Sequence, residues 1–179
     1  MNKLRIEVMA SALLVLPMPA FADTGHAVIK GTTAHPEIEG EVTLTDTASG
    51  LLVQGSLKGA NPGLHGFHIH EFGSCDDNGN AAGGHYNPQG TPHGNLVTDG
   101  PTAAHAGDLG NIKVAEDGSA AWLYTLTNLK LSAGPNAVAG RAFIVHEKLD
   151  DFGQPTGNAG GRIACGTIVI IKPQAPAAN

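Results

Sequence analysis

Charge is scarce in this sequence of 179 residues, and basic charge is scarcest. Charged residues make up 15% of the chain, and 10 basic against 16 acidic residues give a formal net charge of −6. Binding of nucleic acid needs a basic stripe that neutralises phosphates, so the composition argues against nucleic acid as a partner. Internal repeats, low-complexity tracts and an evident interdomain linker are also lacking. We therefore expect one domain with a full hydrophobic core.

Long apolar runs are lacking too, apart from a short one near the N-terminus. Lys3 and Arg5 precede apolar residues 8–16, and an A-x-A triplet follows at residues 20–22. The run is too short to cross a bilayer, and this arrangement is typical of a secretory signal peptide. A buried N-terminal strand or helix is the less favoured alternative. We expect residues 1–22 to be a signal peptide, with no membrane partner for the mature protein.

Removal of that leader leaves residues 23–179 as one mature domain, which is then periplasmic or secreted. It removes two basic residues and one acidic residue, so the formal charge changes from −6 to −7. Only two cysteines are present, Cys75 and Cys165. In an oxidising compartment their default state is one disulfide, and closing a loop of about 90 residues contributes roughly 4–5 kcal/mol through chain entropy. A cysteine metal ligand is the alternative, disfavoured because no C-x-x-C pair is present.

Glycine and proline, by contrast, are abundant, with 25 and 11 residues. This composition suits short strands joined by many turns better than a helical bundle. Extended, alternating patterns predict strands at residues 41–45, 51–57, 63–71, 120–127, 141–146 and 165–171. Residues 73–111 and 147–162 are rich in glycine and lack such a pattern, so we expect two long loops, which in a compact domain are usually functional. The pattern predicts an all-β sandwich or barrel carrying these two loops.

Histidine is concentrated in the middle of the chain. His68 and His70 alternate with Phe67 and Ile69 on a predicted strand, so both imidazoles share one face. Paired histidines on one face of a strand are suited to binding a metal. Residue His65 has the parity of Phe67, so we expect it to be a hydrogen-bonded structural histidine.

The remaining central histidines suggest two metals. Three histidines and a carboxylate in the first long loop make a complete set for structural zinc: His85, His93, His105 and Asp108. Each loop histidine alone would be a solvated turn residue, but the loop has no other evident source of order. His68, His70 and His146 lie on predicted strands, and an all-imidazole set suits copper. Copper needs one more nitrogen, which a shared imidazole would supply.

Five segments follow one another along the mature chain: GFHIHEFGSC (66–75), GHYNP (84–88), HAGDLGN (105–111), VHEK (145–148) and GNAGGRIACG (157–166). In this order they resemble the copper/zinc superoxide dismutase family, over nearly the whole mature chain. The resemblance implies an eight-stranded Greek-key β-barrel, akin to the immunoglobulin-like sandwich, whose metals lie outside it under two long loops.

The resemblance also implies one copper ion and one zinc ion per subunit. It assigns copper to His68, His70, His85 and His146, and zinc to His85, His93, His105 and Asp108, so that His85 bridges the metals. It pairs Cys75 with Cys165. It gives Asp150 the role of a carboxylate linking a copper-ligand histidine to a zinc-ligand histidine, although its neighbour Asp151 is an alternative.

The implied activity is that of an antioxidant oxidoreductase. Copper cycling between Cu(II) and Cu(I) would convert superoxide anion to oxygen and hydrogen peroxide, protecting the cell envelope. The resemblance places Arg162 near the open copper position, where its guanidinium suits a small anion, and Thr156, a weaker match, opposite it. His85 would supply a proton. The resemblance implies a homodimer, and the alternative function is an exported, non-catalytic copper/zinc-binding module.

Several features stand apart from this assignment. Loop 147–162 is short and lacks the lysine-and-glutamate cluster of many family members, so Arg162 and Lys148 are the expected sources of positive potential. We expect His26 and His35, near the mature N-terminus, to be solvated. The aromatic pair on residues 122 and 124 is expected to pack in the core or at an interface.

Overall fold

The computed structural model describes residues 24–171, so the expected signal peptide lies outside the described residues. Nine strands and two short helices follow one another: β1 (Thr24–Gly31), β2 (Glu39–Thr47), β3 (Gly50–Lys58), β4 (Gly63–His70), η1 (Asn80–Ala82), α1 (Leu96–Asp99), β5 (Asp108–Val114), β6 (Ala120–Leu126), β7 (Ala142–His146), β8 (Arg162–Thr167) and β9 (Val169–Ile171). Within this range, neither helix is long and apolar enough to span a membrane.

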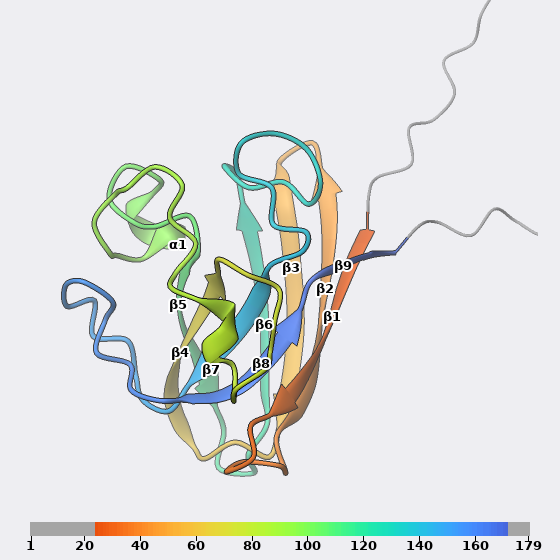
Figure 1. The fold of residues 1–179 in the computed structure, drawn as a ribbon, viewed down its shortest axis with the longest axis vertical. Coiled ribbons are helices and arrows are strands. Elements are labelled where there is room, and N and C mark those ends of the chain that lie inside the picture. Colours follow the sequence, from red (N-terminus) through yellow and green to blue (C-terminus); the bar gives the residue numbers. More distant parts are fainter. Residues whose placement is uncertain (1–23, 172–179) are drawn as a thin grey trace, which may run out of the picture.

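The strands form a nearly closed antiparallel barrel (Figure 1). Their order is β5-β4-β7-β8-β1-β2-β3-β6, and β9 continues alongside β1. The two end strands, β5 and β6, contact each other, and the Tyr124 hydroxyl donates across this seam to the Asn111 carbonyl at 3.4 Å. Strands adjacent in space but distant in sequence, such as β4 and β7, give the Greek-key connections. The expected eight-stranded, all-β Greek-key barrel is confirmed.

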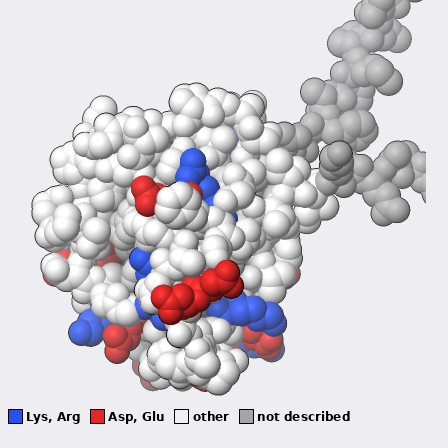
Figure 2. Space-filling view, in the orientation of Figure 1, with Lys and Arg blue, Asp and Glu red and all other residues white. Residues whose placement is uncertain are grey.

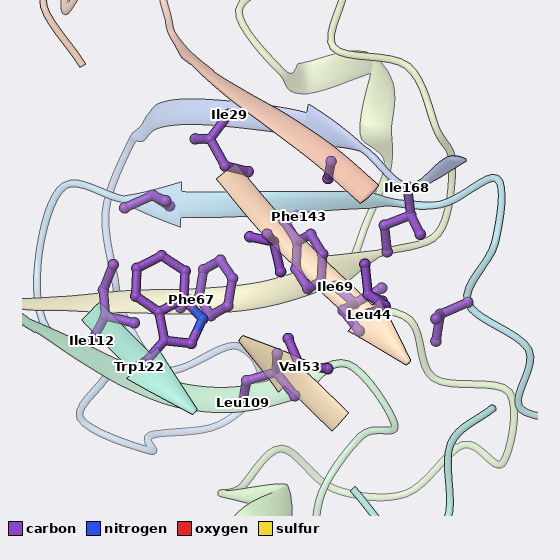
Figure 3. Close-up of a cluster of buried hydrophobic side chains, with 14 of the residues drawn as sticks. Ile29, Leu44, Val53, Phe67, Ile69, Leu109, Ile112, Trp122, Phe143 and Ile168 are labelled. Carbon is purple, nitrogen blue, oxygen red and sulfur yellow. The ribbon is translucent and has the colours of Figure 1, made fainter. Parts of the chain in front are cut away.

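Aliphatic side chains and three aromatic rings fill the barrel interior (Figure 3). Phe67 stacks on Phe143 with ring centroids 5.1 Å apart, and meets Trp122 edge-on at 4.9 Å. Phe67 and Ile69 are fully buried in this core. Because successive side chains of a strand point to opposite faces, the inward position of these two residues turns His68 and His70 out of the barrel.

Strand β5 corrects the expectation that residues 73–111 are all loop. It begins at Asp108, and its pairing with β4 shifts register between Gly66 and His68. Its first three residues are all buried, because the loops cover the outer face here, so polar and apolar residues do not alternate. Irregular, doubly covered strands lack the period-2 pattern by which strands are recognised.

The first long loop is fastened to the barrel. Cys75 and Cys165 form a disulfide with an S–S distance of 2.03 Å, which joins this loop to β8. Arg141 lies 3.4 Å over the ring of Tyr86, and its Nη1 donates to the Glu71 carbonyl. The face of the molecule in Figure 2 is mostly uncharged, so few groups set its local potential.

Candidate metal centre

The first histidine cluster takes three of its members from the ends of two neighbouring strands. His68 and His70 lie at the end of β4, and His146 ends β7, which pairs with β4 in antiparallel register. The first loop returns to this edge, where the Tyr86 amide donates to the Ile69 carbonyl and His85 pairs with His70 as an isolated bridge. All four histidines are buried on the outer side of the barrel.

The nitrogens of these four histidines face a common point. One ring nitrogen from each of His68, His70, His85 and His146 lies within 4.8 Å of the others. The Nδ1 atoms of His70 and His146 lie 3.0 Å and 3.3 Å from carbonyl oxygens, so these nitrogens carry the proton. Their Nε2 atoms, which then present lone pairs, lie only 3.4 Å apart. Two facing lone pairs repel each other unless a cation lies close to both.

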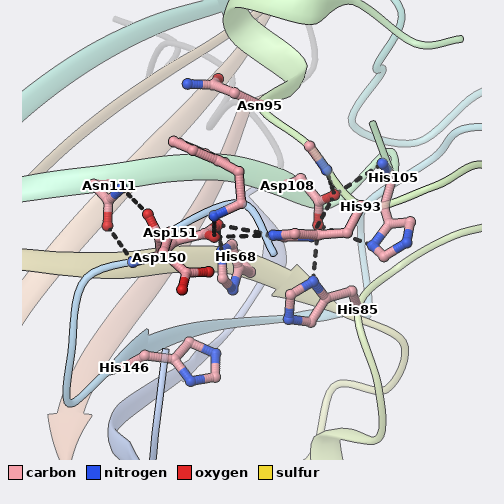
Figure 4. Close-up of polar contacts among 12 residues, drawn as sticks. His68, His85, His93, Asn95, His105, Asp108, Asn111, His146, Asp150 and Asp151 are labelled. Atoms are coloured by element: carbon pink, nitrogen blue, oxygen red, sulfur yellow. Dashed lines mark hydrogen bonds and ion pairs between the residues drawn. The ribbon is translucent and has the colours of Figure 1, made fainter. Parts of the chain in front are cut away.

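A second cluster converges on one carboxylate (Figure 4). Three Nδ1 atoms lie near Asp108: that of His85 at 2.8 Å, that of His93 at 2.8 Å and that of His105 at 3.0 Å. Asp108 is fully buried, and its Oδ2 also accepts from the amides of Gly94 and His105. Three imidazole nitrogens and one carboxylate oxygen match the donor set of a tetrahedral zinc site.

Asp150 joins the two clusters. Its carboxylate is fully buried and accepts from His68 Nε2 at 2.8 Å and from His93 Nε2 at 3.0 Å. The bond to His68 Nε2 leaves Nδ1 of that ring without a proton, and this Nδ1 is buried without a hydrogen bond to any described residue. His93 Nδ1 faces Asp108 instead, at 2.8 Å. The neighbouring Asp151 instead accepts from Gly153 and Asn158, so position 150 occupies the linking place.

Burial and pairing decide the charge of these groups. Burial lowers the pKa of His70 to about 2, of His146 to about 3 and of His85 to about 4, so these rings are neutral at neutral pH. For His93, burial acts against the charge, but hydrogen bonds to Asp108 and Asp150 outweigh it and raise the pKa to about 9. Hydrogen bonds from His105, His85 and His93 outweigh burial for Asp108 and hold the pKa of its carboxyl group below the usual range. Bonds from His68 and His93 lower the pKa of Asp150 in the same way.

One side of the first cluster opens to solvent. A pocket of about 230 Å³ is lined by His70, His85 and His146 on one side and by Thr156 and Arg162 on the other. Arg162 is half-buried and donates from Nη2 to the Gly83 carbonyl at 2.6 Å and from Nη1 to that of Gly79. A guanidinium has five N–H groups, so these two contacts leave donors for an anion. A larger hollow of about 740 Å³ lies elsewhere, on the outer face of β1, β2, β3 and β6.

The remaining histidines lie outside both clusters. His65 is buried, with ring nitrogens 2.8 Å from the His146 carbonyl and 2.9 Å from that of Asn61. His26 and His35 are partly exposed beside Glu41 and Glu37. Sequence reasoning missed the Gly79 and Gly83 carbonyls that hold Arg162, because a main-chain acceptor leaves no mark on residue type.

A family model described as copper/zinc superoxide dismutase (SODC) matches residues 38–168. The chain belongs to the copper/zinc superoxide dismutase family. It is also similar to a crystal structure of the clock protein EA4, with 34% sequence identity and a TM-score of 0.75, covering 88% of this chain and 100% of that chain.

Copper and zinc, the metals of the copper/zinc superoxide dismutase family, fit these donor sets. The buried Nδ1 of His68 and the facing Nε2 atoms of His70 and His146 are lone pairs that a copper ion would satisfy. The three Nδ1 atoms around Asp108 suit zinc. His85 belongs to both clusters, with Nδ1 towards Asp108 and Nε2 left for the other.

Proposed function

We propose that this protein is a catalytic copper/zinc superoxide dismutase that works in the periplasm or outside the cell. Each chain would bind one copper ion through His68, His70, His85 and His146, and one zinc ion through His85, His93, His105 and Asp108. The observation that carries the proposal is the shared pocket, in which the guanidinium of Arg162 and three histidines of the first cluster line one small opening.

The reaction converts two superoxide anions and two protons to one oxygen and one hydrogen peroxide. Copper, when bound, supplies the one-electron redox chemistry. Arg162 binds and orients the anion, because a guanidinium stays charged and offers several donors in a plane. The Nε2 atom of His85 would alternate between binding copper and holding a proton, which it would pass to the product. Asp150 keeps His68 and His93 in the tautomers that leave Nδ1 free.

The local field matters because the whole protein repels its substrate. The mature chain has a formal charge of −7, and superoxide is an anion. Superoxide dismutase is itself a standard example of electrostatic steering towards a charged cleft. Here Arg162 lines the pocket, while Lys148 is exposed on the adjoining loop. Arg162 is therefore the main source of steering in this proposal.

A non-catalytic copper/zinc-binding module is the second candidate. A similar chain is described as a clock protein, a description that names no enzyme activity. The complete donor sets and the placement of Arg162 favour the enzyme. A dismutase without its arginine or a copper ligand would lose rate, whereas a binding module has no need of an anion pocket.

Metal analysis combined with a superoxide-decay assay tests the proposal. The mature protein, reconstituted with both metals, should hold about one copper and one zinc per chain and should accelerate superoxide decay. His70→Ala should abolish activity and keep zinc, since His70 belongs to the first cluster alone. Metal-loaded wild-type protein without activity would favour the binding module. Light scattering of the loaded protein tests the expected homodimer.

A further inference from the structure

The side chain of Gln154 pairs with the main chain of His93 in both directions. The His93 amide donates to Gln154 Oε1 at 3.1 Å, and Gln154 Nε2 donates to the His93 carbonyl at 2.8 Å. The two residues lie 61 positions apart, in the two different long loops. A carboxamide has one acceptor oxygen and one NH₂ donor group. It can therefore pair with the N–H and the C=O of one residue, as the backbone of a neighbouring strand does.

Gln154 belongs to a compact turn, residues 150–157, which we call the capping turn. The turn is closed by hydrogen bonds from the Gly157 amide to Gly153 at 2.7 Å and from the Asp151 amide to Gly157 at 2.9 Å. On its inner side, Asp150 bonds to His93 Nε2. The Phe152 ring stacks near the His93 ring, with centroids 6.5 Å apart and planes 24° from parallel.

The capping turn covers the cluster around Asp108. On the inner side of the turn, His93 is 3% exposed and Asp150 is fully buried. On its outer side, Phe152 and Gln154 are exposed to solvent. The first cluster, by contrast, opens to the pocket that Arg162 lines. An ion at Asp108 therefore lies behind the capping turn, and an ion among His70, His85 and His146 has a route through the pocket.

We propose that Gln154 is a positioning residue that latches the capping turn over the zinc site and slows the release of zinc. The inference rests on the zinc site of the proposed function. For zinc to leave, the His93 ring has to swing away from Asp108 and water has to enter. Both motions require the turn to lift from His93, and the two Gln154 hydrogen bonds resist it. The carboxamide acts through the His93 main chain and contributes no ligand atom.

Zinc transfer to a colorimetric chelator tests the latch in the copper- and zinc-loaded protein. Gln154→Met keeps an unbranched side chain of similar length and removes both hydrogen bonds, so we expect zinc release about tenfold faster, or about 1.4 kcal/mol. Gln154→Glu retains an oxygen for the His93 amide and loses the donor, so its rate should fall between those of wild type and Gln154→Met. Hydrogen exchange at the His93 amide should accelerate in the same order.

Gln89→Met is the matched control, because Gln89 is an exposed glutamine of the first loop that bonds to Asn136, away from His93. Its zinc release and the copper release of all variants should stay at wild-type rates. Zinc release from Gln154→Met within twofold of wild type would overturn the latch, as would an equal acceleration of copper release, which would indicate general loosening. Absence of zinc from reconstituted wild-type protein would overturn both the zinc site and the latch. If wild type binds zinc and Gln154→Met releases it at the wild-type rate, the latch alone is overturned.

Discussion

Arg162 and His70 donate to the same oxygen atom, the carbonyl of Gly83. The distances are 2.6 Å from Arg162 Nη2 and 3.0 Å from His70 Nδ1. One main-chain group therefore sets both the position of the guanidinium in the pocket and the tautomer of an imidazole in the first cluster. The place where an anion would be attracted and the place where copper would be held are linked through a single peptide.

Replacement of Arg162 should separate attraction from metal binding. We expect Arg162→Ala to lower the second-order rate of superoxide decay more than tenfold with copper content unchanged, because the pocket loses its positive charge. Arg162→Lys should recover part of the rate, since it restores charge without the planar donors. The wild-type rate should fall as salt rises, because ions screen the field over about 8–10 Å at physiological ionic strength. An unchanged rate and salt dependence in Arg162→Ala would shift the role to Lys148 or another group.

Glycine at position 157 should be required by the carboxylate beside it. A Cβ there would lie 1.9 Å from Asp150 Oδ1 and 2.6 Å from His93 Nε2, and φ is +78°. Gly157→Ala should therefore displace Asp150, lower zinc content and reduce the unfolding temperature. The control is Gly90→Ala, where φ is +66° and nothing lies within 4 Å, so only backbone strain of about 1–2 kcal/mol is expected. Equal losses in the two variants would mean that contact with Asp150 is unimportant.

The disulfide should protect the first loop from proteolysis. Replacing Cys75 and Cys165 together by serine removes a link that closes 90 residues, worth about 4–5 kcal/mol at most by chain entropy. We expect a lower unfolding temperature and faster cleavage within residues 73–83, measured by limited proteolysis and mass spectrometry. Ser74→Ala, which leaves the link intact, should be cleaved at the wild-type rate. Cleavage of the double variant at that same rate would show that other contacts hold the loop.

Stability of the metal-free protein should be greatest near neutral pH. Burial lowers the pKa values of His70, His85 and His146 below 6.5, so the unfolded chain binds more protons as the pH falls below about 6.5, and folding is disfavoured. His93 acts oppositely: its raised pKa of about 9 contributes stability that is fully present below about 6.5 and lost as the pH rises towards 9. Unfolding temperatures of chelator-treated protein, measured between about pH 5 and pH 9, test both the loss of stability in acid and the loss in base. If the unfolding temperature instead rose steadily as the pH was lowered to about 5, the effect expected from His70, His85 and His146 would be contradicted.

The local pattern of the sequence was sufficient for much of the barrel. Extended, alternating patterns predicted strands that overlap β2, β3, β4, β6 and β7. Residues 165–171 were expected as one strand, but they form the end of β8 and all of β9, which part at Ile168. The Ile168 amide bonds to the Arg141 carbonyl there, a partner that the local pattern does not specify.

Donor types and their faces were also readable from the sequence. His68 and His70 share a face because side chains on a strand repeat every two residues, and this required no knowledge of distant residues. Three loop histidines with an aspartate indicated zinc because of their ligand chemistry. The family resemblance added which residues belong to which metal.

Only the tertiary structure distinguished Asp150 from Asp151 and identified the Gly83 carbonyl as the shared acceptor of Arg162 and His70. The path of the 147–162 loop turns the first aspartate towards His68 and His93 and the second towards Asn158. It likewise brings Gln154 to His93. Composition and periodicity report which groups a chain carries and which face of a strand they share. Which nitrogen keeps its proton depends on acceptors brought from tens of residues away, and folding alone supplies them.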